Sequence, residues 1–240
     1  MSITWRHSPD PRNKRMAANP TVSAVLFDLD GTLLDTAPDL VFAANAALAE
    51  ADIPPRSVDE LKPCISGGAA VMLRCAFNGD YEPALFGRVQ QRMLELYHAH
   101  VADRTRFFDG TESVLGELER RGIPWGIVTN KMSRFTDPLL KKLNLADRAG
   151  CVISGDTTAE KKPHPLPLLE ASRRLNHPPE ECVYIGDAPG DVEAGRRAGM
   201  TTLTALYGYI AAEHAPHDWG ADGLLATPRD LLPWLDGALS

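Results

Sequence analysis

The chain has 240 residues, of which 44% are hydrophobic and 24% are charged, and its formal net charge is −7. This composition predicts a globular protein with a full hydrophobic core, and its acidic balance argues against a nucleic-acid partner, because a phosphate backbone binds basic surfaces. No uninterrupted apolar run approaches ~20 residues, so a membrane partner is not expected either.

The N-terminal part of the chain changes character at about residue 21. Residues 1–20 are polar, include prolines and have no apolar run after their basic residues, so they predict a disordered extension rather than a secretory signal. The first apolar run, Val22–Phe27, predicts a buried strand. A helical pattern of apolar residues follows over 38–51 and ends at Pro54-Pro55.

The middle and the C-terminal half of the chain differ in their predicted secondary structure. Residues 57–103 show three further helical patterns and no convincing strand. From Phe107 onward, helical and strand patterns alternate, which favours an α/β fold with a parallel sheet and helices on both faces. The expected helices cover 111–121, 133–143, 165–175 and 191–198, and the expected strands cover 124–129, 150–154, 182–186 and 201–205.

The four cysteines are widely spaced and form no C-x-x-C pair. We therefore expect reduced thiols in a cytoplasmic protein. Cys151 and Cys182 lie in predicted core strands, where packing explains them, and the other two are Cys64 and Cys75.

Chemistry-bearing side chains follow four of the predicted strands, and the carboxyl ends of parallel strands are where such sheets bind ligands. These residues are Asp28 and Asp30, Thr129 and Asn130, Lys162, and Asp187 and Asp191. A carboxylate can attack phosphorus and form an acyl phosphate, which divides one difficult displacement into two. Several carboxylates would repel a phosphate dianion unless a hard cation intervened, and Mg²⁺ is the natural choice.

Each motif also has a plain structural interpretation. A strand-end Asp-x-Asp is common turn chemistry, a Thr-Asn pair often caps a helix, and a lysine before proline is usually solvated. Aspartates after Gly186 also favour a helix N-terminus. Their joint occurrence, in order and each at a strand end, favours phosphoryl transfer over these separate explanations.

The motifs together resemble those of a known family. Asp28-Leu-Asp-Gly-Thr-Leu-Leu-Asp35, Thr129, Lys162-Pro163 and Gly186-Asp-x-x-x-Asp191 are similar to the four signature motifs of the haloacid dehalogenase superfamily. The resemblance covers residues 22–240 and favours its phosphoglycolate phosphatase-like branch. It implies a Rossmann-like parallel-sheet core, residues 21–35 and 105–240, interrupted by an all-helical cap, residues 36–104.

The resemblance also implies a role for each candidate residue. It assigns the nucleophile to Asp28, the general acid/base to Asp30, phosphate binding to Thr129, Asn130 and Lys162, Mg²⁺ binding to Asp28, Asp30, Asp187 and Asp191, and substrate specificity to Ser66, Gly67 and Gly68 in the cap. The implied activity is Mg²⁺-dependent hydrolysis of a small phosphorylated metabolite by a monomer or homodimer.

The substrate and some alternatives stay open at this point. Segments 125–131, 207–210 and 218–222 are similar both to phosphoglycolate phosphatases and to N-acetylmuramic acid 6-phosphate phosphatases of peptidoglycan recycling. The sequence ranks 2-phosphoglycolate first and the amino-sugar phosphate second, with a sugar phosphomutase behind them. A signalling receiver domain would lack the helical insert, and the complete motif set gives no reason to prefer an inactive binding protein.

Overall fold

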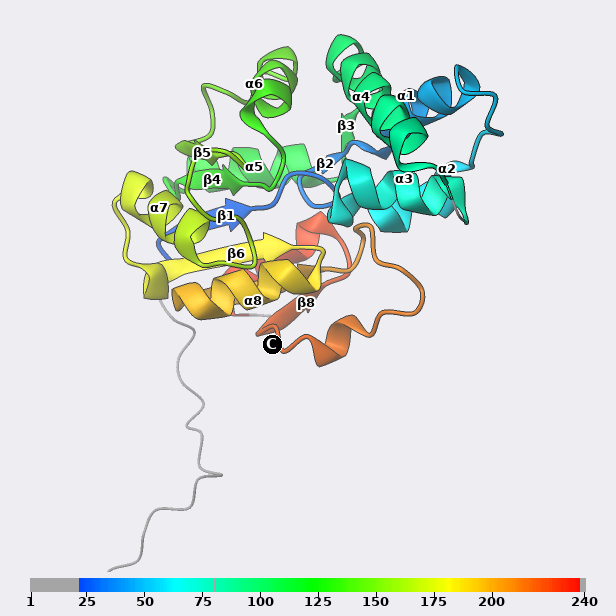
Figure 1. Ribbon diagram of the computed structural model, residues 1–240. Coiled ribbons are helices and arrows are strands. Elements are labelled where there is room, and N and C mark those ends of the chain that lie inside the picture. The colour runs from blue at the N-terminus through cyan, green and yellow to red at the C-terminus, as the bar shows by residue number, and fades with distance from the viewer. Residues whose placement is uncertain (1–21, 80, 238–240) are drawn as a thin grey trace, which may run out of the picture.

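The structure is a computed structural model that describes residues 22–79 and 81–237 (Figure 1). The extension predicted over residues 1–20 lies outside the described residues. Within them, no helix is long and apolar enough to cross a membrane.

A six-stranded parallel sheet forms the centre of the molecule, in the order β5-β4-β1-β6-β7-β8. Its strands are β1 (Ala24–Phe27), β4 (Trp125–Val128), β5 (Cys151–Ile153), β6 (Cys182–Gly186), β7 (Thr201–Ala205) and β8 (Gly223–Leu225). Phe27 is in register with Ile127 on one side and Ile185 on the other. The carboxyl ends of β4, β1 and β6 therefore meet at one edge of the sheet.

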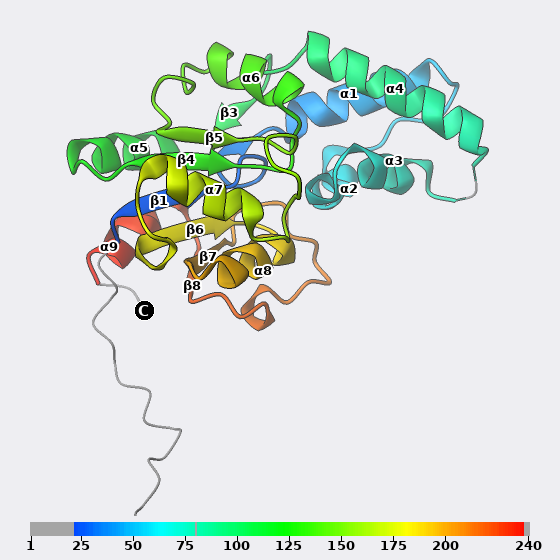
Figure 2. The same cartoon turned by 60° about the vertical axis from the view of Figure 1, so that its left-hand side comes forward.

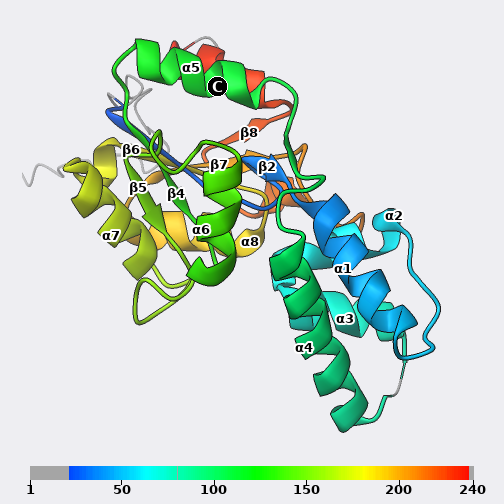
Figure 3. The same cartoon turned by 90° about the horizontal axis from the view of Figure 1, so that it is seen from above.

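Helices cover both faces of this sheet, which explains why most residues of its strands are buried (Figure 3). Alternate residues of β1 enter different cores: Val25 and Phe27 pack on one face, and Ala24 and Leu26 on the other. The first core also contains side chains of α5 (Thr111–Arg120), α6 (Ser133–Lys142) and α9 (Leu231–Leu235), and the second those of α7 (Leu166–Leu175) and α8 (Pro189–Ala198). The predicted α/β fold class is confirmed.

A helical unit stands beside the carboxyl edge of the sheet (Figures 2 and 3). It consists of α1 (Ala37–Ala49), α2 (Val58–Leu61), the 3₁₀ helix Lys62–Gly67, α3 (Ala69–Phe77) and α4 (Pro83–Ala99). Its two connections to the sheet pair with each other as short antiparallel strands, β2 (Leu34–Asp35) and β3 (Arg106–Phe107). The chain therefore leaves the core and returns to it at neighbouring points.

A buried carboxylate fastens these two connections together. The side chain of Asp39, in the first turn of α1, is fully buried. It accepts hydrogen bonds from the backbone N–H of Arg104 at 2.9 and 3.1 Å, from that of Thr105 at 2.9 Å, and from the Thr105 hydroxyl at 2.7 Å. We call these contacts the Asp39 clip; charge-assisted bonds of this kind are stronger than those between neutral groups.

The sequence prediction was wrong for one pair of cysteines. Cys64 and Cys75 form a disulfide, whereas Cys151 and Cys182 are free and buried, as expected. The spacing of 11 residues looks uninformative in sequence. The turn between the 3₁₀ helix and α3 nevertheless reverses the chain and places the two Cα atoms 6.8 Å apart, a distance that a disulfide can span.

Candidate active site

The loop after β1 presents two carboxylates to the same side. Leu29 is fully buried, so Asp28 and Asp30, on either side of it, both face the cavity at the sheet edge. Gly31 then turns the chain with φ of 82°, and a Cβ atom there would lie 2.1 Å from the Oδ2 atom of Asp187. Glycine is therefore required for the loop to approach the end of β6.

Three carboxylates converge at the ends of β1 and β6. Asp28, Asp187 and Asp191 each offer an oxygen atom, and these atoms lie within 4.8 Å of one another. Burial raises the pKa of Asp28 to about 7; Lys162 opposes this shift, and Asp191 adds to it. Burial, reinforced by Asp28 and Asp191, also raises the pKa of Asp187 well above its usual value. Negative charge at this cluster therefore needs a cation nearby.

Asp187 and Asp191 differ in how their oxygens are used. Asp187 Oδ2 accepts a hydrogen bond from the backbone N–H of Tyr209 at 2.7 Å, but its Oδ1 is buried without a hydrogen-bond partner among the described residues. Asp191 Oδ1 accepts from Lys162 and Tyr184, and its Oδ2 from the backbone N–H of Ala188 at 3.1 Å. An orphaned buried carboxylate oxygen beside Asp28 fits a hard cation, whereas Asp191 is already engaged by protein donors.

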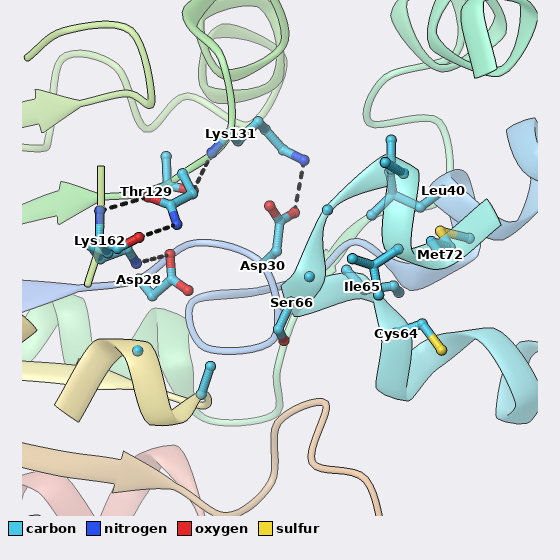
Figure 4. Close-up of a pocket in the computed structure, with 18 of the residues that line it drawn as sticks. Asp28, Asp30, Leu40, Cys64, Ile65, Ser66, Met72, Thr129, Lys131 and Lys162 are labelled. Carbon is cyan, nitrogen blue, oxygen red and sulfur yellow. Dashed lines mark hydrogen bonds and ion pairs between the residues drawn. The ribbon is translucent and has the colours of Figure 1, made fainter. Parts of the chain in front are cut away.

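Lys162 is the buried cation of the cluster. Its Nζ atom lies 2.9 Å from Asp28 Oδ1 (Figure 4). It also lies 2.7 Å from Asp191 Oδ1 and donates to the Tyr184 hydroxyl at 2.6 Å. Burial alone would lower the pKa of Lys162, but Asp191 and Asp28 raise it to about 12. The lysine therefore stays charged at neutral pH and can face both the nucleophile candidate and a phosphoryl group.

The end of β4 supplies two more predicted residues. Thr129 is buried at the cavity wall, and its Oγ1 accepts a hydrogen bond from the backbone N–H of Lys131 at 3.1 Å. The amide of Asn130 spans to the main chain of Lys162: Nδ2 donates to its carbonyl at 3.0 Å, and Oδ1 accepts from its N–H at 3.1 Å. The side chain of Asn130 therefore holds the lysine segment in place.

Lys131 lies in the site, although it is not among the predicted site residues. Its Nζ is 2.9 Å from Asp30 Oδ1, and it lies 4.8 Å from the centre of the buried Tyr97 ring. Burial would lower the pKa of Lys131, but Asp30 outweighs that effect and raises it. Thr36 also donates to Asp30 Oδ1, at 2.5 Å. The signal that could have found Lys131 is its position two residues after Thr129, at the same strand end.

Tyr209, a second unpredicted residue, joins the site to the helical unit. Its backbone holds Asp187, and its hydroxyl donates to Asp35 Oδ1 at 2.7 Å and accepts from the N–H of Ala37 at 2.9 Å. Tyr209 binds Asp187 through its main-chain N–H. Because almost every residue has this group, the type of the residue does not predict the contact.

A cavity of about 820 Å³ lies between most of these groups and the helical unit. Ser66 lies across it from Thr129 and Lys162, with Asp28 and Asp30 between them (Figure 4). Every predicted site residue lines this cavity except Asp187, which is buried behind Asp28; the lining set is Asp28, Asp30, Ser66, Gly67, Gly68, Thr129, Asn130, Lys162 and Asp191.

Comparison with known proteins gives a consistent result. Residues 25–205 match the family model of the haloacid dehalogenase-like hydrolases. The chain is 40% identical to the N-acetylmuramic acid 6-phosphate phosphatase of Pseudomonas putida (90% of this chain, 97% of that protein) and 42% identical to the phosphoglycolate phosphatase of Xanthomonas campestris (87% and 94%). The crystal structure of a predicted phosphoglycolate phosphatase from Haemophilus somnus superimposes with a TM-score of 0.81, at 23% identity, over 90% of this chain and 99% of that one.

The parallel sheet with carboxylates at the ends of its central strands, together with the family match, places the chain among hydrolytic enzymes with an α/β fold. The chain belongs to the haloacid dehalogenase-like hydrolase family. With relatives named phosphatases, it is a phosphoric monoester hydrolase. The resemblance seen in the motifs is thereby confirmed, and the receiver-domain alternative is set aside.

Proposed function

We propose that this enzyme is a Mg²⁺-dependent phosphatase of a phosphorylated amino sugar that carries a carboxylate, of the N-acetylmuramic acid 6-phosphate type. The observation that carries this proposal is the size of the cavity above Asp28. At about 820 Å³, it lies within the ~300–1,000 Å³ of pockets that enclose drug-sized ligands. A sugar ring with an acetamido group would occupy such a space.

The chemistry follows from the residues at the sheet edge. Asp28 attacks phosphorus, and the bond from phosphorus to the ester oxygen breaks as Asp30 gives its proton to that oxygen. Asp30 then takes a proton from water, whose oxygen attacks the aspartyl phosphate and regenerates Asp28. Lys162 and Thr129 offer donors to the phosphoryl oxygens, and Lys131 holds Asp30 in place.

Mg²⁺ would be held by the carboxylates of Asp28 and Asp187 together with the main-chain carbonyl of Asp30. When bound, it supplies positive charge that offsets the phosphate and the carboxylates. Asp191 is assigned a positioning role instead, because both of its oxygens already accept hydrogen bonds from the protein.

Mg²⁺ is expected to raise the melting temperature of the protein, because it satisfies the buried Oδ1 atom of Asp187. At a concentration of about 100 Kd, the gain is about 2.7 kcal/mol. Thermal unfolding in MgCl₂ and in KCl of equal ionic strength measures it, with Asp187→Asn as a variant that loses the shift. EDTA should abolish turnover. An unchanged melting temperature, together with full activity after metal stripping, would refute the metal assignment.

We infer that residues 36–104 act as a cap on a core of residues 21–35 and 105–240. The cap closes over the cavity, excludes bulk water and selects the leaving group. Ser66, Gly67 and Gly68 are exposed on the cavity side of this unit, which supports their assignment to substrate specificity. The proposed enzyme works in the cytoplasm, as a monomer or homodimer.

2-Phosphoglycolate, ranked first from the sequence, is the second candidate substrate. The Xanthomonas campestris relative carries that name, and the backbone N–H groups of Ala69 and Ala70, which begin α3 after the glycine-rich turn, line the cavity and could bind a small carboxylate. The cavity is nevertheless large for a two-carbon acid. The reaction centre itself would serve both substrates equally. Only the part of the cavity beyond Asp28 can discriminate between them.

We expect kcat/KM for N-acetylmuramic acid 6-phosphate to exceed that for 2-phosphoglycolate by at least about a hundredfold, or about 2.7 kcal/mol of transition-state binding. The larger substrate can use cavity contacts that the smaller one cannot reach. Steady-state rates with both compounds, measured side by side with p-nitrophenyl phosphate as a reference, decide this. A preference for 2-phosphoglycolate would return the substrate assignment to the ranking from the sequence.

A further inference from the structure

The cavity has a second end, away from the three carboxylates. An adjoining cavity of about 670 Å³ lies between α4 and α6, which are neighbours in Figures 2 and 3. Four residues line both spaces: Gln90, Leu94, Arg134 and Phe135. Arg134, in the first turn of α6, therefore lies where the two cavities adjoin.

Arg134 differs from the other strong cations of the cavity wall. Lys131 is paired with Asp30, and Lys162 with Asp28 and Asp191. Lys161 is exposed, with its Nζ 3.6 Å from the sulfur of Met132. Over residues 22–79 and 81–237, no carboxylate forms an ion pair with Arg134. Its positive charge is available to an anion that enters the cavity.

The side chain of Arg134 is exposed, and its guanidinium lies against a buried ring. It lies 4.6 Å from the centre of the Phe135 ring, and Phe135 itself is 5% exposed. Stacking on a buried ring limits the rotamers of a long side chain, so less entropy is lost when it binds. A planar guanidinium forms two parallel hydrogen bonds with a carboxylate, a geometry that lysine does not offer.

We propose that Arg134 is a specificity-determining residue that binds the carboxylate of the substrate's leaving group. The substrate class is then a phosphate monoester whose leaving group carries a second anionic group, a carboxylate. This inference rests on the proposed function, because both candidate substrates carry such a carboxylate. In a chain of net charge −7, a second anion needs a local cation of this kind to bind.

The test compares each carboxylated substrate with a partner that lacks the carboxylate; in the amino-sugar pair the partner lacks the whole lactyl ether that bears it. N-acetylmuramic acid 6-phosphate is paired with N-acetylglucosamine 6-phosphate, and 2-phosphoglycolate with ethyl phosphate. Arg134→Met should lower kcat/KM for the preferred carboxylated substrate by about 10- to 100-fold, the range for a charged hydrogen bond. Rates with its carboxylate-free partner should change less than about threefold. The loss should fall mainly in KM, because the contact is made equally in the ground state and the transition state.

Two further variants sharpen the result. Arg134→Lys keeps the positive charge but lacks the planar guanidinium. Compared with Arg134→Met, it should restore part of the preference for the carboxylated substrate. Lys141→Met removes one positive charge from an exposed position of the same helix that lines neither cavity, and it should leave both rates unchanged.

The outcomes separate the two proposals. If the wild-type enzyme prefers 2-phosphoglycolate, the substrate assignment is wrong. The role of Arg134 is then tested with 2-phosphoglycolate and ethyl phosphate. If the wild type distinguishes the acid from its carboxylate-free partner and Arg134→Met keeps that preference, the role of Arg134 is wrong while the proposed function stands. If the wild type makes no such distinction in either pair, carboxylate recognition itself is wrong.

Discussion

Asp28→Asn is expected to lower kcat by at least about 10³-fold, or about 4 kcal/mol of activation free energy. An amide cannot form the acyl phosphate, and it binds a hard cation poorly. The fold should persist, because burial already raises the pKa of Asp28 and a neutral group of the same shape suits the position. Turnover of p-nitrophenyl phosphate, with the thermal unfolding of each protein, measures both effects.

The matched control is Asp147→Asn, which changes an exposed aspartate outside the cavity and should leave kcat unchanged. In the Asp28→Asn enzyme, Lys162 keeps Asp191 as an ionic partner. The substitution therefore does not leave a buried charge unpaired, and the fold should persist. An Asp28→Asn enzyme that keeps more than a tenth of wild-type kcat, a loss below ~1.4 kcal/mol, rules out the nucleophile assignment.

Asp30→Asn is expected to lower the rate of the first chemical step by about 10²- to 10⁴-fold for a poor leaving group, the usual contribution of general acid catalysis. The loss should be much smaller for p-nitrophenyl phosphate, whose phenolate needs little protonation. Single-turnover bursts with p-nitrophenyl phosphate and with an alkyl phosphate isolate this step from hydrolysis of the phosphoenzyme.

A structural effect of the same substitution must be separated from proton transfer. Asp30 is the ionic partner of the buried Lys131, so Asp30→Asn also leaves that charge uncompensated and should lower the melting temperature. Lys131→Met, which keeps the carboxylate, provides the comparison. If the burst falls equally for good and poor leaving groups, Asp30 does not act as the general acid.

The sheet and most of the site could be predicted because they follow from local patterns. Strand patterns in the sequence predicted five of the six strands, all except β8, and parallel topology places Asp28, Thr129 and Asp187 at one edge. β8 was missed because its Gly-Leu-Leu sequence has no β-branched residue, unlike the equally short Cys-Val-Ile of β5, and so gives no strand signal. β2 and β3 are shorter still.

Other parts of the site depend on contacts between distant segments. The disulfide between Cys64 and Cys75 follows from a turn whose direction spacing does not reveal. Tyr209 holds Asp187 through a backbone N–H, and the Asn130 side chain bonds to the main chain of Lys162. Such contacts depend on where the backbone of one segment meets another segment. The type of a residue does not show where that meeting occurs. The free volume above Asp28 is likewise a property of packing.

The Asp39 clip bears on how enzymes of this architecture can diversify. Because it fastens together the points where the chain leaves and re-enters the core, the inserted helices span a short fixed gap, the arrangement that lets one domain be inserted into another without disturbing it. Exchanging residues between the two fastened segments would leave the register of β1, β4 and β6 unchanged, with Asp28, Thr129 and Asp187 still in place. Under the proposed cap role of residues 36–104, such an exchange would change the part of the cavity wall that the helical unit supplies and keep the residues at the sheet edge.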